Sequence, residues 1–199
     1  MVLCYSRKLY VEFTVSEKEE NWLQCHQNAF EYFGGVPEKV MVDNCKTAVI
    51  SHGMGSEVIF NNRYLDFSKH YGFRPIACNV RSPHEKGRVE NAVGYVKKSF
   101  LKGLDIGEFK LINPKVRHWL ETVANCRTHG QTHQKPEELF QKEEKQKLLP
   151  LPVNPYEACR IQECKINSLF RFTLDTNRYS VPSEYIGERV QLHIYAHKI

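Results

Sequence analysis

The chain has 199 residues, of which 41% are hydrophobic and 26% are charged, and its net charge is +5. This balance predicts a globular protein of one large domain or two small ones and excludes a disordered chain. No apolar run approaches the ~20 residues that a membrane-spanning helix needs, and no signal peptide precedes the fold, so we expect a cytoplasmic protein without membrane contact. The mild positive charge favours a polyanionic partner without requiring one.

Seven cysteines are spread along the chain, and most of them lie inside apolar runs. An odd number in such places predicts reduced thiols rather than a disulfide framework. Cys159 and Cys164 are spaced more widely than a redox Cys-x-x-Cys pair. We therefore interpret them as two half-buried thiols.

The first part of the chain predicts a hairpin followed by a helix. Alternating apolar residues indicate strands at 2–5 and 9–15, joined by a short turn. Ser16 followed by Glu19 matches a capping box, which predicts a helix that runs from there to about residue 33. Gly34 ends this helix, because glycine is common just after a helix C-terminus.

Further along, the pattern predicts alternating strands and helices. Strands are expected at 39–42 and 73–79, and helices at 62–71, 84–102 and 115–125. The polar stretch 46–60, with Gly53 and Gly55, is interpreted as a loop or small insertion. Together these elements predict an α/β domain with a mixed sheet flanked by helices.

A second unit follows a proline-rich stretch at 149–152. Beyond it, residues that favour β-structure predict short strands at 170–174, 179–182 and 190–195. This pattern is typical of a small antiparallel barrel. We therefore expect a first domain over 1–140, a linker over 141–155 and a second domain over 156–199.

Two acidic residues stand in places that suit a metal ligand. Asp43 ends the short buried strand at 39–42, and an acid at the carboxyl end of such a strand points into the crevice where open α/β sheets bind ligands. The alternative is that Asp43 and Asn44 only form a turn. Glu90 lies on the helix predicted at 84–102, at the border between an apolar and a polar stripe.

The helix that carries Glu90 is also cationic. Its basic residues include Lys86, Arg88, Lys97, Lys98 and Lys102. Such a helix suits the phosphate backbone of a nucleic acid, although ordinary Lys/Glu pairs on a surface helix explain the same pattern. Glu85 is a second candidate ligand, but it falls on another face of the helix.

Motifs around these acids resemble those of a known family. Asp43 and Asn44 are followed by Tyr71-Gly-Phe-x-Pro75 and then by Pro83-x-x-x-Gly87-x-x-Glu90. This order resembles the catalytic core of retroviral integrases and of their bacterial transposase relatives, which carry an Asp-Asp-Glu triad on an RNase-H-like fold. The 46 residues between Asp43 and Glu90 are more than is usual in the retroviral enzymes.

Motifs after the core narrow the resemblance. Asn125-x-Arg127-x-His129-Gly130 and Pro136-Glu-Glu-Leu-Phe140 are similar to the segment that follows the core in IstA-type insertion-sequence transposases. Tyr179-Ser-Val-Pro182 is similar to a motif of their C-terminal β-barrel. IstA-type proteins work with an ATPase partner called IstB. The resemblance extends over nearly the whole chain.

The resemblance implies a fold and an activity. We expect an RNase-H-like integrase core followed by a small β-barrel, and metal-dependent cleavage and joining of DNA in transposition. Asp43 and Glu90 would hold Mg²⁺ (or Mn²⁺), and the DNA-contacting residues would be Lys86, Arg88, Lys97, Lys98, Arg127 and His129. Implied partners are the DNA of the transposon ends and target, further copies of the protein and an IstB-type ATPase, at the bacterial nucleoid.

The chain departs from the family pattern at both ends. The first catalytic Asp of the family lies on a strand before the hairpin with which this chain begins, and that strand is central in the family's sheet. Its loss should leave a gap between neighbouring strands. The barrel pattern is also cut short. We therefore expect an internal fragment, from a truncated gene or a deliberately shortened protein, with little or no catalysis alone.

Other interpretations stay open at the level of sequence. A non-catalytic protein that only binds DNA would keep the basic helix and the barrel, and an RNase-H-type nuclease would use the same acids. Cys126, His129 and His133 imitate a zinc spacing, but no fourth ligand is obvious nearby. We therefore expect no zinc at that place.

Overall fold

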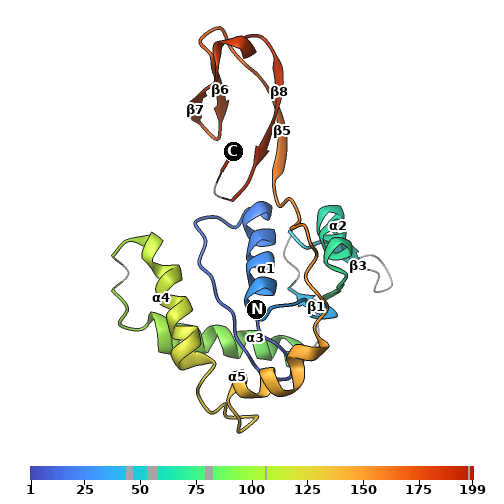
Figure 1. Ribbon diagram of the computed structural model, residues 1–199, viewed down its shortest axis with the longest axis vertical. Coiled ribbons are helices and arrows are strands. Elements are labelled where there is room, and N and C mark those ends of the chain that lie inside the picture. Colours follow the sequence, from blue (N-terminus) through green and yellow to red (C-terminus); the bar gives the residue numbers. More distant parts are fainter. Residues whose placement is uncertain (44–46, 53–57, 79–82, 106, 197) are drawn as a thin grey trace.

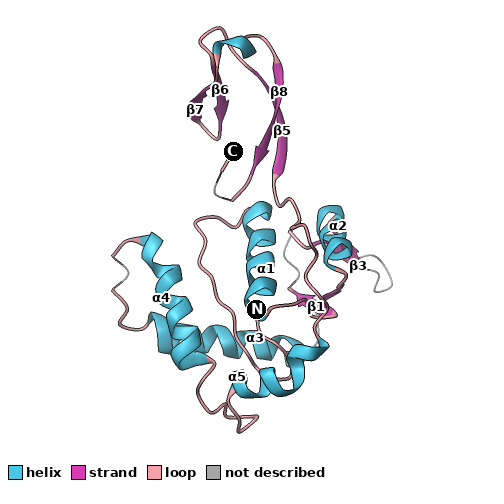
Figure 2. Cartoon of the chain, in the orientation of Figure 1, coloured by secondary structure: helices cyan, strands magenta, loops and turns pink. Residues whose placement is uncertain are grey.

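The computed structural model describes residues 1–43, 47–52, 58–78, 83–105, 107–196 and 198–199 (Figure 1). It is a mixed α/β structure. A larger part is built around one central helix, and a smaller lobe of four strands, the C-terminal lobe, covers residues 160–194 (Figure 2). None of the described helices is long and apolar enough to cross a membrane.

The central helix is α1 (Glu19–Phe33), which buries one face. Its end agrees with the prediction: Gly34 has φ 73°, a conformation that favours glycine, and its N–H donates to the Glu31 carbonyl. Its start does not. The residue before the helix is Lys18, and the Ser16 hydroxyl accepts from the Lys18 N–H (3.2 Å) outside the helix. The capping box predicted at Ser16 is therefore wrong.

Two parallel strands, β1 (Lys39–Val42) and β4 (Arg74–Ala77), form the sheet beside α1. The helix α2 (Asn62–Tyr71) lies between them in the chain, with Asn61 capping its start and Gly72 its end. The bounds predicted for β1 and α2 are confirmed, whereas the strand predicted at 73–79 is shorter than expected.

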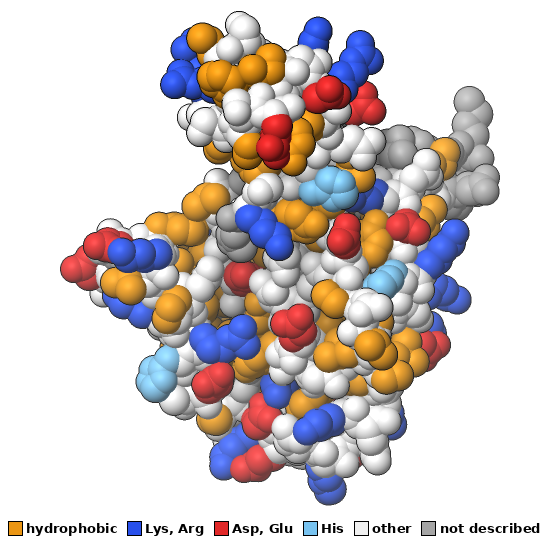
Figure 3. Space-filling view, turned by 45° about the horizontal axis from the view of Figure 1, so that its top comes forward, with side chains coloured by type: hydrophobic (Ala, Val, Ile, Leu, Met, Phe, Trp, Pro, Cys, Tyr) orange, Lys and Arg blue, Asp and Glu red, His pale blue; other side chains and the backbone are white. Residues whose placement is uncertain are grey.

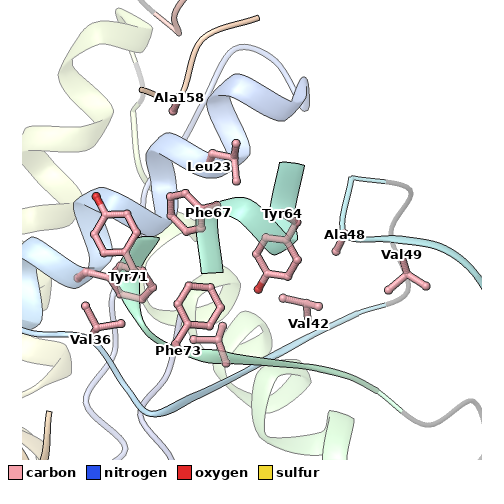
Figure 4. Packing of buried hydrophobic residues seen from close by; sticks show 12 residues of the cluster. Leu23, Val36, Val42, Ala48, Val49, Tyr64, Phe67, Tyr71, Phe73 and Ala158 are labelled. Carbon is pink, nitrogen blue, oxygen red and sulfur yellow. The ribbon is translucent and has the colours of Figure 1, made fainter. Parts of the chain in front are cut away.

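The main hydrophobic core lies between α1, α2 and the two parallel strands. Figure 4 shows the rings of Tyr64, Phe67 and Phe73 packed between the helices and the strands. Tyr64 and Phe67 are fully buried. Because burial of a large apolar side chain contributes about 2–3 kcal/mol, these rings fix α2 over β1 and β4.

A β-hairpin stands where the sequence predicts a loop or insertion. Its strands are β2 (Val49–His52) and β3 (Val58–Phe60), which pair antiparallel. The loop interpretation is therefore wrong for these residues. The side chains of Val49, Val58 and Phe60 pack on the main core, which holds the hairpin in place. Gly53 and Gly55 lie outside the described residues.

The N-terminal segment (residues 1–13) forms a shorter hairpin than the two strands predicted. Val2 and Leu9 form a single β-bridge, and the Leu3 N–H donates to the Lys8 carbonyl (2.9 Å). Residues 10–15 belong to no strand in the described part of the chain. Their backbone groups must therefore find partners elsewhere.

Two asparagine side chains take the place of a strand partner for this segment. Asn125 accepts from the Leu9 N–H (2.8 Å) and donates to the Leu9 carbonyl (3.0 Å). Asn113 makes the same pair of bonds with Phe13, at 2.8 and 2.9 Å. Each amide satisfies both backbone groups of one residue, as a neighbouring strand would. We call Asn113 and Asn125 the asparagine clamp.

The remaining helices lie beside and below α1 in Figure 1. Each helix predicted at 84–102 and 115–125 is an α-helix that widens into a π-helical turn. These are α3 (Pro83–Tyr95) with Val96–Leu101, and α4 (Ile112–Trp119) with Leu120–Ala124. A short α5 (Pro136–Leu139) begins with a proline and continues into Phe140–Glu144. Single 3-10 turns cover Phe109–Leu111 and Lys145–Lys147.

The segment predicted as a linker, 141–155, makes close contacts with the larger part. Val36 and Leu149 form a β-bridge with hydrogen bonds of 2.9 and 2.8 Å. Gly35 permits this approach, because a Cβ there would lie only 2.7 Å from the Leu148 Cβ. Tyr156 and Ala158, just beyond, join the main core.

The C-terminal lobe contains two antiparallel pairs of strands. β5 (Arg160–Lys165) pairs with β8 (Arg189–Ile194), and β6 (Arg171–Leu174) pairs with β7 (Asn177–Ser180). A tight turn joins β6 and β7, with Asp175 at φ 44° and Thr176 at φ 70°. A 3-10 turn, Ser183–Tyr185, precedes β8. The described strands form two separate pairs, so the predicted barrel is not seen as a closed sheet among them.

Candidate catalytic cavity and cationic pocket

Asp43 directly follows the last residue of β1. Its side chain is exposed and lines a cavity of about 1120 Å³. The cavity lies between the N-terminal segment, β1, α1 and α3. Asp43 therefore opens onto a hollow large enough for a polymer backbone or a further segment of chain.

The wall that α3 and its π-helical turn contribute is mostly apolar and includes two cations. It consists of Arg88, Val89, Ala92, Val93, Val96, Lys97 and Leu101. Val89 and Val93 keep 52% and 47% of their surface exposed. Apolar side chains left exposed beside a hollow suit a surface that another group covers.

Glu90 lies on α3 next to this wall. Its side chain is exposed, and it is not among the residues that line the cavity. It precedes Lys97 by about two helical turns, so the two residues lie on the same side of the helix. The structure thus brings Asp43, Arg88 and Lys97 to one cavity and leaves Glu90 beside it.

The cavity also borders an incomplete sheet. β1 pairs with β4 and with no other described strand. Residues 37–43, which include β1, face the same hollow as the N-terminal segment. The family resemblance predicts a gap between neighbouring strands, and the cavity lies between these two extended segments.

A second pocket, of about 220 Å³, is cationic and shares Arg88 with the larger cavity. Arg127 and His129, two other residues predicted to contact DNA, also line it. Arg7 lines it as well and was not predicted, because one basic residue in a short turn carries no signal of its own. The three arginines that line it give this pocket its positive charge, whereas Figure 3 shows side chains of both signs mixed over one face of the molecule.

Neighbouring groups hold two of the arginines. The Arg127 guanidinium lies 3.8 Å from the Tyr95 ring centroid and donates to the Ala124 carbonyl. Arg7 donates from Nη1 to the Cys4 carbonyl (2.6 Å), and its buried Nε has no partner among the described residues. A buried guanidinium N–H without an acceptor suits an anion.

His129 adds a donor without adding charge. Burial, with Arg127 and Arg7 acting in the same direction, lowers its pKa, so the imidazole is neutral at pH 7. Nδ1 accepts from the Gln131 N–H (3.2 Å), which leaves the ring proton on Nε2. The ring can therefore donate one hydrogen bond to an anion.

Two further residues predicted to contact DNA, Lys97 and Lys98, do not line the cationic pocket. Lys97 and Lys98 are exposed, and Lys97 lines the larger cavity. The side chains of Lys86 and Glu85 lie outside the described part of the structure.

Within the described residues, the one group of three metal-ligating side chains within 4.8 Å of one another is Glu157, Cys159 and His193. Asp43 and Glu90 belong to no such group, so the described acids provide at most a pair of ligands near the cavity.

Comparisons with known families match two parts of the chain. Residues 1–83 match the integrase core domain, and residues 151–199 match the C-terminal domain of Mu transposase. The chain therefore resembles an integrase core followed by a Mu-type C-terminal domain.

Bacterial relatives match a longer part of the chain. The chain is 32% identical over 188 residues to a putative transposase for insertion sequence element IS5376 of Geobacillus stearothermophilus. The matched residues make up 94% of this chain and 46% of the relative. It is 32% identical over 193 residues to the transposase for insertion sequence element IS21 of Pseudomonas aeruginosa, with coverages of 96% and 49%. Over nearly its whole length the chain is thus similar to insertion-sequence transposases of the IS21 type. It spans slightly less than half the length of these two relatives.

Proposed function

We propose that the chain is the catalytic-core and C-terminal part of a transposase that cuts and joins DNA during transposition. The observation that carries this proposal is the position of Arg88, which lines both the cavity beside Asp43 and the cationic pocket. A phosphodiester held in the pocket would lie next to the cavity that contains the carboxylate. The names of the relatives support the same activity.

Asp43 and Glu90 are the proposed ligands for Mg²⁺ or Mn²⁺. Both offer carboxylate oxygens from exposed side chains, which is the donor chemistry that these ions prefer. A divalent ion bound there would stabilise charge on the phosphate oxygens and lower the pKa of a bound water or hydroxyl group. Because the described acids give no group of three ligands here, we infer that a third carboxylate comes from the rest of a longer polypeptide.

The cationic pocket would hold the DNA backbone. Arg88 and Arg127 present planar guanidinium groups, which bind phosphate oxygens in pairs. Neutral His129 would donate one more hydrogen bond, and the exposed Lys97 and Lys98 would add charge along α3. These contacts position DNA without reading its bases, so the affinity should fall as the salt concentration rises.

The intact protein would need more than this chain. A strand from the remaining polypeptide would fill the cavity beside β1 and complete an RNase-H-like core, and the C-terminal lobe would form a small barrel. Chain 1–199 alone should therefore be inactive, because two carboxylates hold divalent ions weakly. At the bacterial nucleoid, the intact protein would assemble with further copies of itself and with an IstB-type ATPase.

The test of this function uses a version extended to the length of its relatives. Asp43→Asn and Glu90→Gln should each abolish strand transfer, measured by the joining of labelled DNA ends, while a mobility shift shows that DNA binding is kept. Glu108→Gln, at an exposed position away from the cavity, should keep both activities. Joining at the wild-type rate by either of the first two variants would contradict the assignment. DNA cleavage by chain 1–199 with Mg²⁺ would contradict the inferred third ligand.

A second candidate is a protein that binds DNA without chemistry. The cationic pocket favours it, because neither Asp43 nor Glu90 lines that pocket. If the extended version failed to join DNA, and chain 1–199 shifted DNA in a way that depended on salt but not on Mg²⁺ or Glu90, this candidate would be preferred. Hydrolysis of RNA–DNA hybrids would instead indicate an RNase-H-type nuclease.

A further inference from the structure

Three potential metal ligands meet where the C-terminal lobe joins the rest of the chain. The Cys159 Sγ lies 3.6 Å from the His193 Nδ1. The same nitrogen lies 3.9 Å from the Glu157 Oε2. Local sequence patterns give no sign of this group, because Cys159 and His193 are 34 residues apart.

The distance between sulfur and nitrogen matches a tetrahedral zinc site. With Zn–S near 2.3 Å and Zn–N near 2.0–2.1 Å, two ligands at the tetrahedral angle stand about 3.6 Å apart. Cys159 and His193 already have this separation. The same arithmetic gives roughly 3.4 Å between nitrogen and oxygen ligands. The Glu157 carboxylate is slightly farther away, but its side chain is 73% exposed and has room to approach.

Packing and strand pairing fix the segments that carry the ligands. Ala158 is buried in the main core, and the Arg63 guanidinium of α2 donates to the Cys159 carbonyl, which holds the thiol in place. His193 lies on β8, opposite Ile161 of β5. Glu157 and Cys159 lie just before β5, outside any strand, and the pairing of β5 with β8 brings His193 next to them.

The group is partly open to solvent. The Cys159 residue is 5% exposed, whereas 42% of the His193 side chain is exposed. A buried thiol with two accessible partners leaves one coordination position for water, as in zinc sites with three protein ligands.

We propose that Cys159, His193 and Glu157 bind one Zn²⁺ ion, with water as the fourth ligand. Binding displaces the thiol proton to solvent, so that a thiolate, a neutral imidazole and a carboxylate hold the ion. Thiolate and imidazole ligands select zinc over the Mg²⁺ proposed for Asp43 and Glu90. The ion ties β8 to the segment 156–159, which packs on the main core.

A hydrogen bond between thiol and imidazole gives the same contact without metal, so the experiment must separate the two. Co²⁺ substitutes for Zn²⁺ in such sites and reveals thiolate ligation by a charge-transfer absorption band in the near ultraviolet. Titration of metal-free, reduced chain 1–199 with Co²⁺ should give this band at one ion per chain, and Zn²⁺ should remove it. Cys159→Ser should abolish the band, and His193→Gln should weaken Co²⁺ binding by about tenfold or more.

Cys164→Ser is the matched control, because Cys164 lies nearby on β5 but packs against the core of the C-terminal lobe. It should keep the band and the affinity. Zn²⁺ should also raise the melting temperature of the wild type and of Cys164→Ser, but not of Cys159→Ser. If circular dichroism shows that Cys159→Ser alters the fold, the Co²⁺ affinity of His193→Gln, which keeps the thiol, decides whether the group binds metal. A wild-type chain without the band, or a band that survives Cys159→Ser, would overturn the proposal.

Discussion

The buried side chain of Asn125 makes three hydrogen bonds to groups of the N-terminal segment and of α1. It is 1% exposed, bonds both backbone groups of Leu9 and donates to the Tyr32 hydroxyl (3.0 Å). Loss of the amide would leave these groups without partners, at a cost of about 1–3 kcal/mol for each buried group. The role of Asn125 is therefore to hold the N-terminal segment, whatever else its motif does.

We predict that Asn125→Leu lowers the free energy of unfolding by about 3 kcal/mol or more, because leucine fills the space but makes no hydrogen bond. Urea denaturation of chain 1–199, followed by circular dichroism, measures this change. Asn154→Leu, at an exposed position, should change the free energy by less than about 0.5 kcal/mol. Equal losses in the two variants would mean that the amide bonds contribute little.

His26 is a second residue whose chemistry depends on burial. Its ring lies 4.3 Å from the Trp22 ring and 6.0 Å from the Tyr64 ring, centroid to centroid. Burial lowers the pKa of His26 to about 4, although a hydrogen bond to the Trp22 carbonyl (2.9 Å) opposes this shift. The folded protein therefore keeps this imidazole neutral where the unfolded chain would protonate it.

We predict that stability falls as the pH falls from 6.5 to 4, because in this range the unfolded chain binds a proton at His26 that the folded chain does not. The full loss should be about 3 kcal/mol. His26→Phe should flatten this dependence, and His118→Phe, at an exposed position on α4, should keep it. Burial lowers the pKa of the Met1 amino group to about 6, which acts in the same direction at higher pH, so denaturation is best compared between pH 4 and 6. A slope unchanged by His26→Phe would contradict this account.

At the scale of elements, the sequence predicts best the helices that have clear end signals. Gly34 ends α1, and α2 lies between Asn61 and Gly72, as the local residues indicate. β5 gave no such signal, because its alternation is inverted: Ile161 is 58% exposed while the polar residues beside it are partly buried. The hairpin at β2 and β3 was hidden by its polar, glycine-containing sequence.

For the candidate site too, the residues with a clear local signal could be predicted and the others could not. Local pattern was enough to select Asp43 at the end of a strand and Arg88 on a cationic helix. It could not select Arg7, which reaches Arg127 and His129 only because the N-terminal segment folds back against α3 and α4. The same is true of His193, whose partner Cys159 lies on a distant part of the chain. Residues that meet only through tertiary packing cannot be recognised from their spacing in the sequence.

The cationic pocket is built by α3, the N-terminal turn and the segment after α4, and its charge is open to test. We predict that Arg88→Gln weakens DNA binding by similar factors for all sequences and lowers the slope of log K against log salt by about 1. Fluorescence anisotropy of chain 1–199 with labelled duplexes at several salt concentrations measures both. Lys142→Gln removes an exposed charge elsewhere and should leave the slope unchanged. The same slope for Arg88→Gln and wild type would exclude the pocket as a phosphate site.

At the scale of the whole molecule, the cavity beside β1 leaves apolar surface uncovered. Exposed apolar side chains line it, and buried contacts that would cover them are missing from this face. The C-terminal lobe is joined to the start of α1 by an exposed ion pair between Lys18 and Asp175 (2.7 Å), which contributes little by itself. The packed segment 156–159 is therefore the main connection between the two parts.

We predict that Val93→Trp, which places a larger side chain at the cavity wall, reduces the fluorescence of a hydrophobic dye bound to chain 1–199. The free energy of unfolding should stay equal or rise by up to about 1 kcal/mol, because the added apolar surface fills empty space. Val123→Trp is the control: Val123 is 45% exposed, close to the 47% of Val93, but does not line the cavity. Equal dye fluorescence in the two variants would mean that the dye binds elsewhere.

The asparagine clamp grips only main-chain atoms, which are alike in every amino acid. Positions 9 and 13 can therefore exchange one apolar side chain for another during divergence and keep their anchorage. The two amides have no such freedom, since even aspartate, the nearest isostere, lacks the donor half of the pair. Positions 9 and 13 should therefore accept many substitutions, whereas positions 113 and 125 should accept few.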